Sequence, residues 1–442
     1  MSIKGQVTTF AERVEIGRRW EAGQSDREIA LALQRPLATV RKWRRRHQHE
    51  GCPGLSSQMG RPARGALGQF PAEIADAILQ MREAHPGWGP VTIMVELKKD
   101  ARFVGLRLPS RARIAAYLKQ KDKVKKYERH QELSVPAPST IQRPHQEWEV
   151  DAQGKLAVAG LGSASIINIL DVFSHVKIDS LPCLRTTHAN TQDYQLVLRR
   201  AFVAYGLPEQ ISFDHDSVFY DNQTASPFPT VLHLWLVALG IGVRFIHKTP
   251  PLEHACIERH HQTVTQQALV GQTFTDEADL QKTLTGRILF LNMDYPSRSL
   301  HGQAPLSAFP QAKQSPRPYR LEWERECLDM QRVYDYLAQG RWFRLTSSVG
   351  MFSLGSQRYN AGCRLARQTL EITFDPQTCE LVCLPEKGTQ PFRLAANGLS
   401  KETLMGDLDP LTTIPVYQLA LPWSRQAWRE NILCRGLGDT TL

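Results

Sequence analysis

The chain of 442 residues is too long for a single hydrophobic core, and its 42% apolar residues are typical of a folded globular protein rather than a disordered one. Its formal charge of +10 is concentrated near the N-terminus, because residues 1–140 contain 26 Lys and Arg against 14 Asp and Glu. No stretch approaches the ~18 apolar residues of a membrane span, and Met1–Lys4 do not begin a secretory signal, so we expect a soluble protein of the cytoplasm. The basic segment indicates a polyanionic partner, although a solvated charged face is the simpler explanation.

Residues 1–50 have the pattern of three short helices. Apolar residues recur at helical spacing over 9–22, and Ser25 with Glu28 forms a capping box for a second helix. A third helix over 37–47 places Val40 and Trp43 inward and a dense cationic face outward. This spacing predicts a helix-turn-helix domain whose third helix enters a major groove of DNA. Its candidates for base or phosphate contact are Thr39, Arg41, Lys42, Arg44, Arg45 and Arg46. The alternative is a solvated helix that binds nothing.

Residues 51–70 are rich in Gly, Ser and Pro and are interpreted as a linker. Arg61 and Arg64 within it are spaced to lie in a minor groove, or the segment is only a flexible tether. Helices are expected over 71–84, 90–99 and 110–121, which makes residues 71–133 a second helix-turn-helix or winged-helix domain. Residues 134–144 form a second linker.

The pattern changes to strands from Trp148 onward. Strands are expected over 148–155, 163–173, 176–181, 210–213 and 243–246, with helices over 190–205, 231–239 and 255–269. This order predicts that residues 145–312 form an α/β ribonuclease H-like core with a mixed five-stranded sheet. Asp151 then lies on the first strand, Asp214 at the end of the fourth, and Glu258 in the helix after the fifth. If the three carboxylates meet at one edge of the sheet, they form an oxygen-lined site suited to Mg²⁺.

Three segments carry a family resemblance. Trp148–Asp151, Phe213–Phe219 and Ala255–His261 resemble the signature segments of DDE transposases and retroviral-type integrases, most of all those of bacterial insertion-sequence transposases. The similarity spans at least residues 9–310. It implies that Asp151, Asp214 and Glu258 are catalytic residues and the ligands of two Mg²⁺ ions, which Mn²⁺ can replace.

The same resemblance implies an enzyme that cleaves DNA and joins it to a target. Its partners would be double-stranded DNA, both transposon ends and target, and further copies of the chain in a homo-oligomer on the bacterial nucleoid. Lys248, Arg259 and His261 are then candidate DNA contacts, or else ordinary surface and packing side chains. Whether an accessory ATPase assists is left open, and the chain has no phosphate-loop signature of its own.

Two departures from the family pattern concern the second acid. Asp214 and Glu258 are separated by 43 residues, more than is common in the family, with an apparent insertion over 220–230. Asp214-His215-Asp216 stands where Asp-Asn-Gly is common, so Asp216 is a rival ligand, because alternate strand residues share a face. Asp171, after the second strand, is interpreted as a structural cap of the strand end.

Residues 313–395 are expected to form a helix over 321–337 and then a small SH3-like β-barrel, built from strands over 341–345, 351–354, 357–359, 369–374 and 380–384. The role of the tail, residues 396–442, stays open. Two rival functions remain beside a transposase. One is a catalytically silent, sequence-specific DNA-binding regulator, and the other is a ribonuclease H-type nuclease that cuts without joining.

Overall fold

The computed structural model describes residues 8–56, 65–124, 140–184, 189–221, 224–246, 255–388 and 390–406. The chain divides into two compact units, Met1–Pro71 and Ala72–Leu442. None of the helices in the described ranges has the length and apolar character needed to span a bilayer. The candidate residues Arg61, Arg64 and Lys248, and the tail beyond residue 406, lie outside the described residues.

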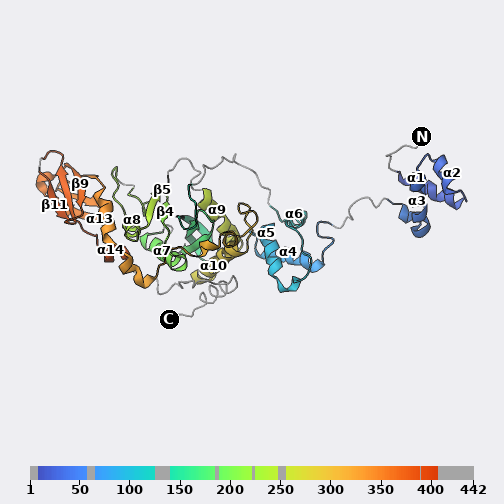
Figure 1. Cartoon of the computed structure of the whole chain (residues 1–442), viewed down its shortest axis with the longest axis horizontal. Helices are drawn as coiled ribbons and strands as arrows, with labels where there is room; N and C mark the ends of the chain where they lie inside the picture. The colour runs from blue at the N-terminus through green and yellow to red at the C-terminus, as the bar shows by residue number, and fades with distance from the viewer. Residues whose placement is uncertain are drawn as a thin grey trace. The chain divides into compact units, whose positions relative to one another are not determined.

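The N-terminal unit contains three helices and a short 3₁₀ turn (Figure 1): α1 (Phe10–Glu21), α2 (Asp26–Ala32), α3 (Leu37–Glu50) and η1 (Cys52–Leu55). Complete capping boxes begin the first two helices, Thr9 with Glu12 and Ser25 with Glu28. The helices enclose a small core that includes Trp43, Ile16, Ile29 and Val40. The predicted helix-turn-helix arrangement of this unit is confirmed.

The next helices are α4 (Ala72–Ala84), α5 (Pro90–Lys99) and α6 (Arg111–Gln120), with the 3₁₀ turn η2 (Ala101–Phe103) before α6. Their bounds agree with the prediction to within one residue. Ile74, Ile78, Ile93 and Ile114 are fully buried between them. Within residues 65–124 the structure contains no strand, and the rest of the predicted domain, residues 125–133, lies outside the described residues.

The core contains a mixed sheet of five strands in the order β3-β2-β1-β4-β5. These are β1 (Glu147–Val158), β2 (Gly162–Asp171), β3 (Lys177–Cys183), β4 (Gln210–Phe213) and β5 (Gly242–Phe245). The first three pair antiparallel, whereas β4 pairs parallel to β1 and β5 parallel to β4. This is the ribonuclease H-like arrangement that the order of elements predicts.

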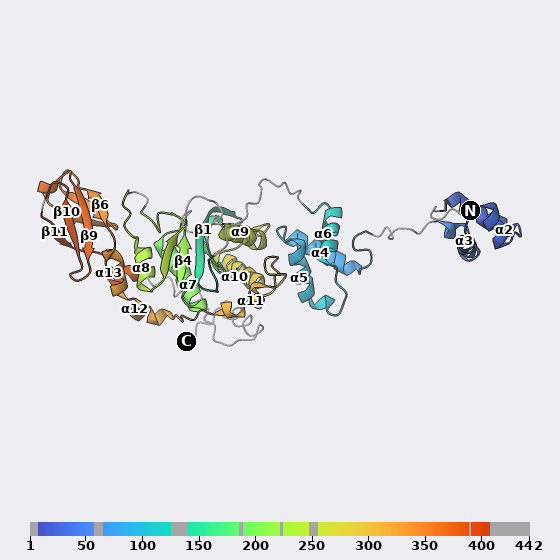
Figure 2. The same cartoon turned by 45° about the horizontal axis from the view of Figure 1, so that its top comes forward.

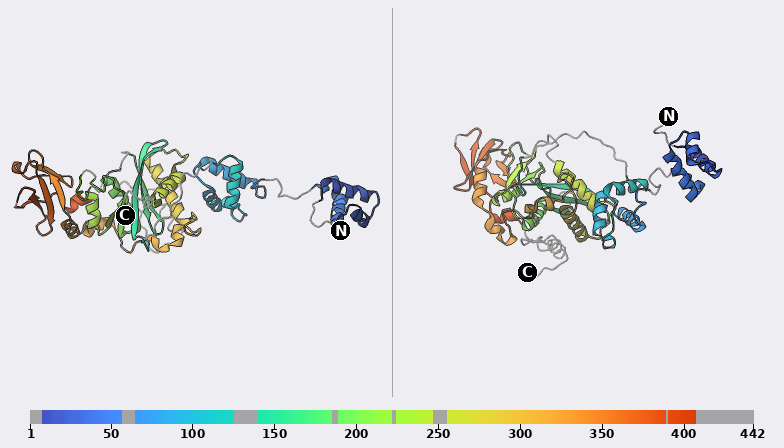
Figure 3. Two further views of the ribbon diagram at one scale, coloured as in Figure 1. Left: turned by 90° about the horizontal axis from the view of Figure 1, so that it is seen from above. Right: turned by 45° about the vertical axis from the view of Figure 1, so that its right-hand side comes forward.

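Helices cover both faces of this sheet. On one face, α7 (Thr191–Tyr205) and α8 (Val231–Ala238) contribute to a large apolar core that includes Trp148, Val150 and Ile167. On the other face, α9 (Ala255–Val264), the π-helical turn η4 (Thr265–Leu269) and α10 (Glu277–Met293) enclose a smaller core around Ile166. Figures 2 and 3 show the green helices and the yellow helices on opposite sides of the sheet. The alternation along β2 produces this division, because neighbouring residues point to opposite faces.

Asp171 closes the end of β2. Its Oδ1 accepts hydrogen bonds from the amide and hydroxyl of Ser174 at 2.8 and 2.6 Å, and its Oδ2 accepts one from the amide of His145 at 2.6 Å. The side chain is fully buried. The interpretation of Asp171 as a structural cap is therefore confirmed.

A chain of short helices leads out of the core: α11 (Pro305–Ala308), η5 (Pro310–Lys313), η6 (Leu321–Trp323), α12 (Glu324–Cys327) and α13 (Met330–Ala338). The single helix predicted over 321–337 is thus wrong. It is divided because Asp329 caps a new helix, its side chain accepting the amide of Gln331. Glu324, the first residue of α12, attaches this segment to the core. Its carboxylate pairs with the guanidinium of Arg199 at 2.6 Å and accepts a hydrogen bond from the indole N–H of Trp235 at 2.9 Å.

The C-terminal strands do not confirm the predicted barrel. They are β6 (Trp342–Leu345), β7 (Met351–Leu354), β8 (Gln357–Asn360), β9 (Thr369–Asp375), β10 (Glu380–Pro385) and β11 (Phe392–Ala395), with η7 (Cys363–Leu365) and α14 (Lys401–Met405). Four of them form an open sheet in the order β11-β10-β9-β6, and β7 and β8 form a separate hairpin. Among the described residues no pairing joins β6 to β11.

The loop between β4 and α8 attaches this sheet to the core. The indole N–H of Trp342 donates to the carbonyl of Pro227 at 3.1 Å, and the Trp342 ring packs on Phe228 with centroids 4.7 Å apart. Arg344 donates to the carbonyl of Ser226 at 2.7 Å and pairs with Asp221 at 3.3 Å. Arg344 is therefore buried in this attachment.

Candidate functional site

Asp151 lies on β1 in a polar row that crosses three strands. It is opposite Asn168 of β2, which is opposite Ser180 of β3. The Ser180 hydroxyl donates to Oδ1 of Asn168 at 2.5 Å, and both side chains are fully buried. The Asp151 side chain is 27% exposed, and its Oδ1 accepts the amide of Ala152 at 2.8 Å. The row therefore ends at its β1 side in a carboxylate that solvent reaches.

The register of β1 with β4 positions the second carboxylate. Glu149 pairs with Ser212 in this parallel ladder, so continuing it by two residues brings Asp151 level with Asp214. Level residues on adjacent strands share a face of the sheet and are separated by roughly 4.8 Å. The last pair of the ladder therefore lies two residues before each of these acids.

The turn after β4 distinguishes Asp214 from its rival. Oδ1 of Asp214 accepts the amide of Asp216 at 3.0 Å. Oδ1 of Asp216 accepts the amide of Val218 at 3.0 Å and the hydroxyl of Ser217 at 3.2 Å, so it caps its own turn. Asp216 also lies beyond the level of Asp151, which favours Asp214 as the ligand.

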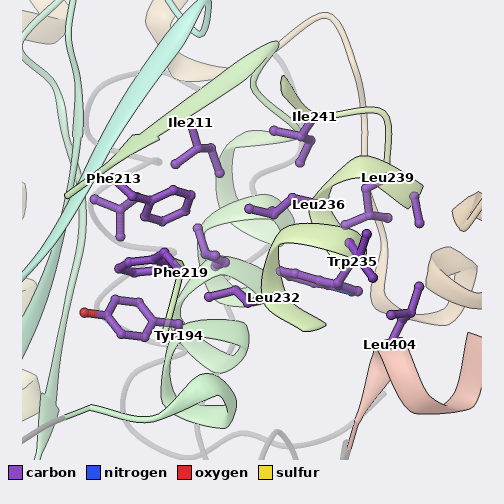
Figure 4. Packing of buried hydrophobic residues seen from close by; sticks show 14 of the residues in the cluster. Tyr194, Ile211, Phe213, Phe219, Leu232, Trp235, Leu236, Leu239, Ile241 and Leu404 are labelled. Carbon is purple, nitrogen blue, oxygen red and sulfur yellow. The ribbon is translucent and has the colours of Figure 1, made fainter. Parts of the chain in front are cut away.

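A buried tyrosine that the sequence analysis missed lies beneath these aspartates. Tyr194, in the first turn of α7, is 2% exposed and packs edge-on against Phe219, which stacks on Phe213 at 4.0 Å. Figure 4 shows its hydroxyl directed away from the apolar cluster. Burial raises the pKa of the Tyr194 hydroxyl, and the carboxylates of Asp151, Asp216 and Asp214 raise it further. One phenol therefore experiences the field of all three aspartates, and the aromatic stack fixes the turn that carries two of them.

Helix α9 brings the third acid and a histidine to the same face of the sheet, where it packs on β1 and β2. His261 is buried, and its Nε2 lies 3.8 Å from Oδ2 of Asp151. Glu258 precedes it by three residues, about one helical turn, and is exposed, as is Arg259. His261 thus faces an aspartate, which gives it a role at the carboxylates in addition to the DNA contact expected for it.

Within the described ranges, no three His, Cys, Asp or Glu side chains are close enough together to hold a metal ion. Asp151 and Asp214 follow the last pair of the β1–β4 ladder by two residues each, and Glu258 is on α9, which packs on β1 and β2. The donor chemistry nevertheless fits Mg²⁺, because all three candidates offer carboxylate oxygen.

Behind α9 lies a buried polar layer that local sequence patterns did not indicate. Glu149 is on the same face of β1 as Asp151 and is 3% exposed, and His260 is 2% exposed. Burial lowers the pKa of Lys177 to about 8, and its ammonium group donates to the carbonyl of His175 at 2.6 Å. Burial also lowers the pKa of His260, with Lys177 and His261 adding to the effect. Helix α9 therefore rests on ionisable groups rather than on a purely apolar surface.

The candidate DNA-binding residues of α3 divide into two groups. Arg41, Lys42 and Arg45 are exposed. Arg44 is held within the unit, since its Nε lies 2.8 Å from Asp26, and the guanidinium of Arg46 lies 5.3 Å from the centre of the Trp43 ring. Thr39 is half-buried in the first turn of the helix. The first group is distinguished by its exposure rather than by a lack of contacts, since Arg41 also lies 3.7 Å from Asp26 and Lys42 lies 5.2 Å from the centre of the Trp43 ring.

Residues 8–56 match the family described as "Homeodomain-like domain". The N-terminal unit is homeodomain-like. Among solved structures, the crystal structure of the catalytic core domain of BIV integrase is similar at 13% identity and a TM-score of 0.28, covering 38% of this chain and 96% of that one. No curated protein matches the chain.

The assignment of the core rests on strand order, register and helix packing rather than on that structural match. The homeodomain-like match agrees with the helix-turn-helix predicted for residues 1–50. The chain thus joins a homeodomain-like unit to a core of ribonuclease H-like topology, which is the combination expected from its resemblance to transposases and integrases.

Proposed function

We propose that this protein is a DNA transposase that binds the ends of a mobile element and catalyses metal-dependent strand cleavage and strand transfer. The observation that supports the proposal is the parallel register of β1 and β4, because its last pair, Glu149 with Ser212, lies two residues before Asp151 and Asp214, and α9 with Glu258 packs on β1. The homeodomain-like unit supports a DNA substrate.

In this proposal, Asp151, Asp214 and Glu258 hold two Mg²⁺ ions, or Mn²⁺ in their place. When bound, such ions activate the attacking oxygen and stabilise the leaving oxygen of a displacement at phosphorus. The chain contributes the positions of the ligands. Asp216 keeps the turn of Asp214 closed, Tyr194 supports that turn from below, and His261 flanks Asp151.

Recognition of the DNA ends is assigned to residues 1–140. Helix α3 would enter a major groove with Thr39, Arg41, Lys42 and Arg45, while Arg61 and Arg64 would follow the backbone into a minor groove. Arg44 and Arg46 would act mainly by holding the helix in place, and Lys248, Arg259 and His261 would contact DNA near the acids. Since each site serves one DNA end at a time, pairing two ends requires at least a dimer, and an accessory ATPase is a further partner to test.

The decisive experiment is a strand-transfer assay on the element's own ends with Mg²⁺ or Mn²⁺. We expect the wild-type protein to join ends to target DNA. Asp151→Asn should lose more than the roughly 10–100-fold that removal of an outer-shell partner costs, with its melting temperature kept. Tight end binding without any reaction would support the silent regulator, and cutting without joining would support the nuclease.

A further inference from the structure

The turn between α4 and α5 is built into the segment that follows the catalytic helix. The indole N–H of Trp88 donates to the carbonyl of Gln267 at 3.2 Å, although the two residues are 179 positions apart. His85 stacks on the Trp88 ring at 3.8 Å, and Trp88 is 9% exposed. The amide group of Gln272 donates to the carbonyl of Ala84 at 2.8 Å. The helices of residues 72–120 are therefore docked on the same chain's core.

Gln267 is the centre of this contact. Its Nε2 donates to the hydroxyl of Thr92 at 2.9 Å, and its Oε1 accepts from Arg287 at 2.8 Å. Arg287 also pairs with Glu96 at 2.8 Å, and its guanidinium lies over the rings of Trp88 and Phe290, 4.4 and 4.0 Å from their centres. Both polar atoms of the Gln267 side-chain amide are therefore hydrogen-bonded, the oxygen to Arg287 of α10 and the nitrogen to Thr92 of α5.

The backbone of the turn between α4 and α5 approaches the backbone of η4 so closely that position 87 has room only for glycine. A Cβ on Gly87 would lie 1.9 Å from the carbonyl oxygen of Gln266. Gly271, with φ of +76°, faces the ring of Pro86, whose Cδ would be 2.4 Å from an added Cβ. Two residues along the same turn, a Cβ on Gly89 would meet nothing within 4 Å. The fit is thus specific to the point where the turn meets η4.

The contact lies on the direct continuation of the catalytic helix. Gln267 is within η4, which follows α9 without interruption after Val264. At its start, the hydroxyl of Thr265 donates to Oε1 of Gln153, two residues beyond Asp151 on β1, at 3.3 Å. Single π-helical turns occur frequently at functional sites. Whatever fixes η4 also fixes how α9 presents Glu258 to β1.

We propose that the docked α4–α6 helices act as a clamp on η4, and that Trp88 and Gln267 are positioning residues for Glu258. DNA engaged by residues 72–120 then acts on the catalytic helix through this contact. The catalytic part of this inference rests on the proposed function, whereas the mechanical part, that docking orders α9, does not.

The test compares Gly87→Ala with Gly89→Ala in the full-length protein. Hydrogen exchange of the backbone amides over 255–269 should become at least about fivefold faster in Gly87→Ala, because overpacking of such a contact costs roughly 1 kcal/mol or more. Gly89→Ala should exchange as the wild type does. The strands β1 to β3 should be unchanged in both, which separates loss of the clamp from general unfolding.

Two further measurements complete the test. Trp88→Phe keeps an aromatic ring, although a smaller one, and removes the N–H donor, and it should increase exchange over 255–269 in the same direction. In strand-transfer assays, Gly87→Ala should lower the rate at saturating DNA while end affinity stays within about twofold. Wild-type exchange over 255–269 in both Gly87→Ala and Trp88→Phe would overturn the clamp. If the wild-type protein transfers no strands, the proposed function fails, and the exchange data alone decide the clamp.

Discussion

Two aspartates in the turn after β4 have different surroundings although only one residue separates them. Asp214 directly follows β4, whereas Asp216 uses one carboxylate oxygen to accept the amide of Val218. An Asn side chain can still accept that amide, but it cannot supply the charge that a cation needs. The two positions can therefore be separated by the same substitution.

We predict that Asp214→Asn lowers metal-dependent strand transfer about a hundredfold or more, by analogy with loss of metal-site partners. Asp216→Asn should stay within about threefold of wild type, because its turn hydrogen bond is kept at a small net cost. Initial rates with Mg²⁺ in excess provide the measurement. The opposite ranking would make Asp216 the ligand.

Local sequence patterns predict some of the candidate site residues and not others. Asp151 and Asp214 could be proposed because one lies within a strand and the other directly after one, where a carboxylate is unusual. Tyr194 could not, since its environment comes from three aspartates distant in sequence and from a stack with Phe219. His261 was found for its place beside Glu258, but its approach to Asp151 depends on how α9 packs.

At the scale of elements, the short helix α12 is fastened to α7 and α8 by one buried ion pair. Glu324 is fully buried and Arg199 is 2% exposed, and the carboxylate also accepts from Trp235 and from the hydroxyl of Tyr319. Burial raises the pKa of Tyr319, and the neighbouring Glu324 raises it further, so the phenol stays protonated as a donor. Removing one partner leaves a buried charge without compensation.

Glu324→Ala should therefore destabilise the protein by about 3–5 kcal/mol. Glu322→Ala, two residues earlier and exposed, should change the free energy of unfolding by no more than about 0.5 kcal/mol. Urea unfolding followed by tryptophan fluorescence would measure both. Equal stability of the two variants would show that the ion pair does not hold α12 in place.

Element boundaries were the most predictable part of the fold, because periodicity and capping residues such as Ser25 act locally. The predictions failed where distant pairing decides. The spacing of the C-terminal strands resembled a barrel, yet closure needs a partner for β6 that no short pattern specifies. The π-helical form of η4 was likewise missed, since its carbonyl and side-chain partners come from Trp88, Thr92 and Arg287.

At the scale of the whole molecule, the boundary after Pro71 separates a small homeodomain-like unit from the rest of the chain. That unit has its own core around Trp43 and its own capping boxes. Its α3 carries exposed cations, among them Arg45. Binding to DNA through such cations releases counterions and weakens as salt increases.

We predict that residues 1–71 expressed alone melt cooperatively and bind duplex DNA with a strongly salt-dependent affinity. Arg45→Ala should reduce the slope of log affinity against log salt by about one, the share of a single phosphate contact. Arg18→Ala is the control, because its exposed guanidinium on α1 pairs with Glu15 at 2.8 Å. Fluorescence anisotropy between low and moderate salt provides both slopes, and identical slopes for the two variants would contradict the prediction.

The loop that lengthens the distance between Asp214 and Glu258 has a consequence for comparing related chains. Its residues are the ones that hold the C-terminal sheet, through Asp221, Ser226, Pro227 and Phe228. The additional residues of this loop therefore attach the C-terminal sheet to the core. A shorter loop would have to omit some of these contacts, so we expect a relative with fewer residues between these acids to attach its C-terminal sheet differently. The number of residues between Asp214 and Glu258 can thus indicate, from the sequence alone, how the C-terminal sheet is attached to the core.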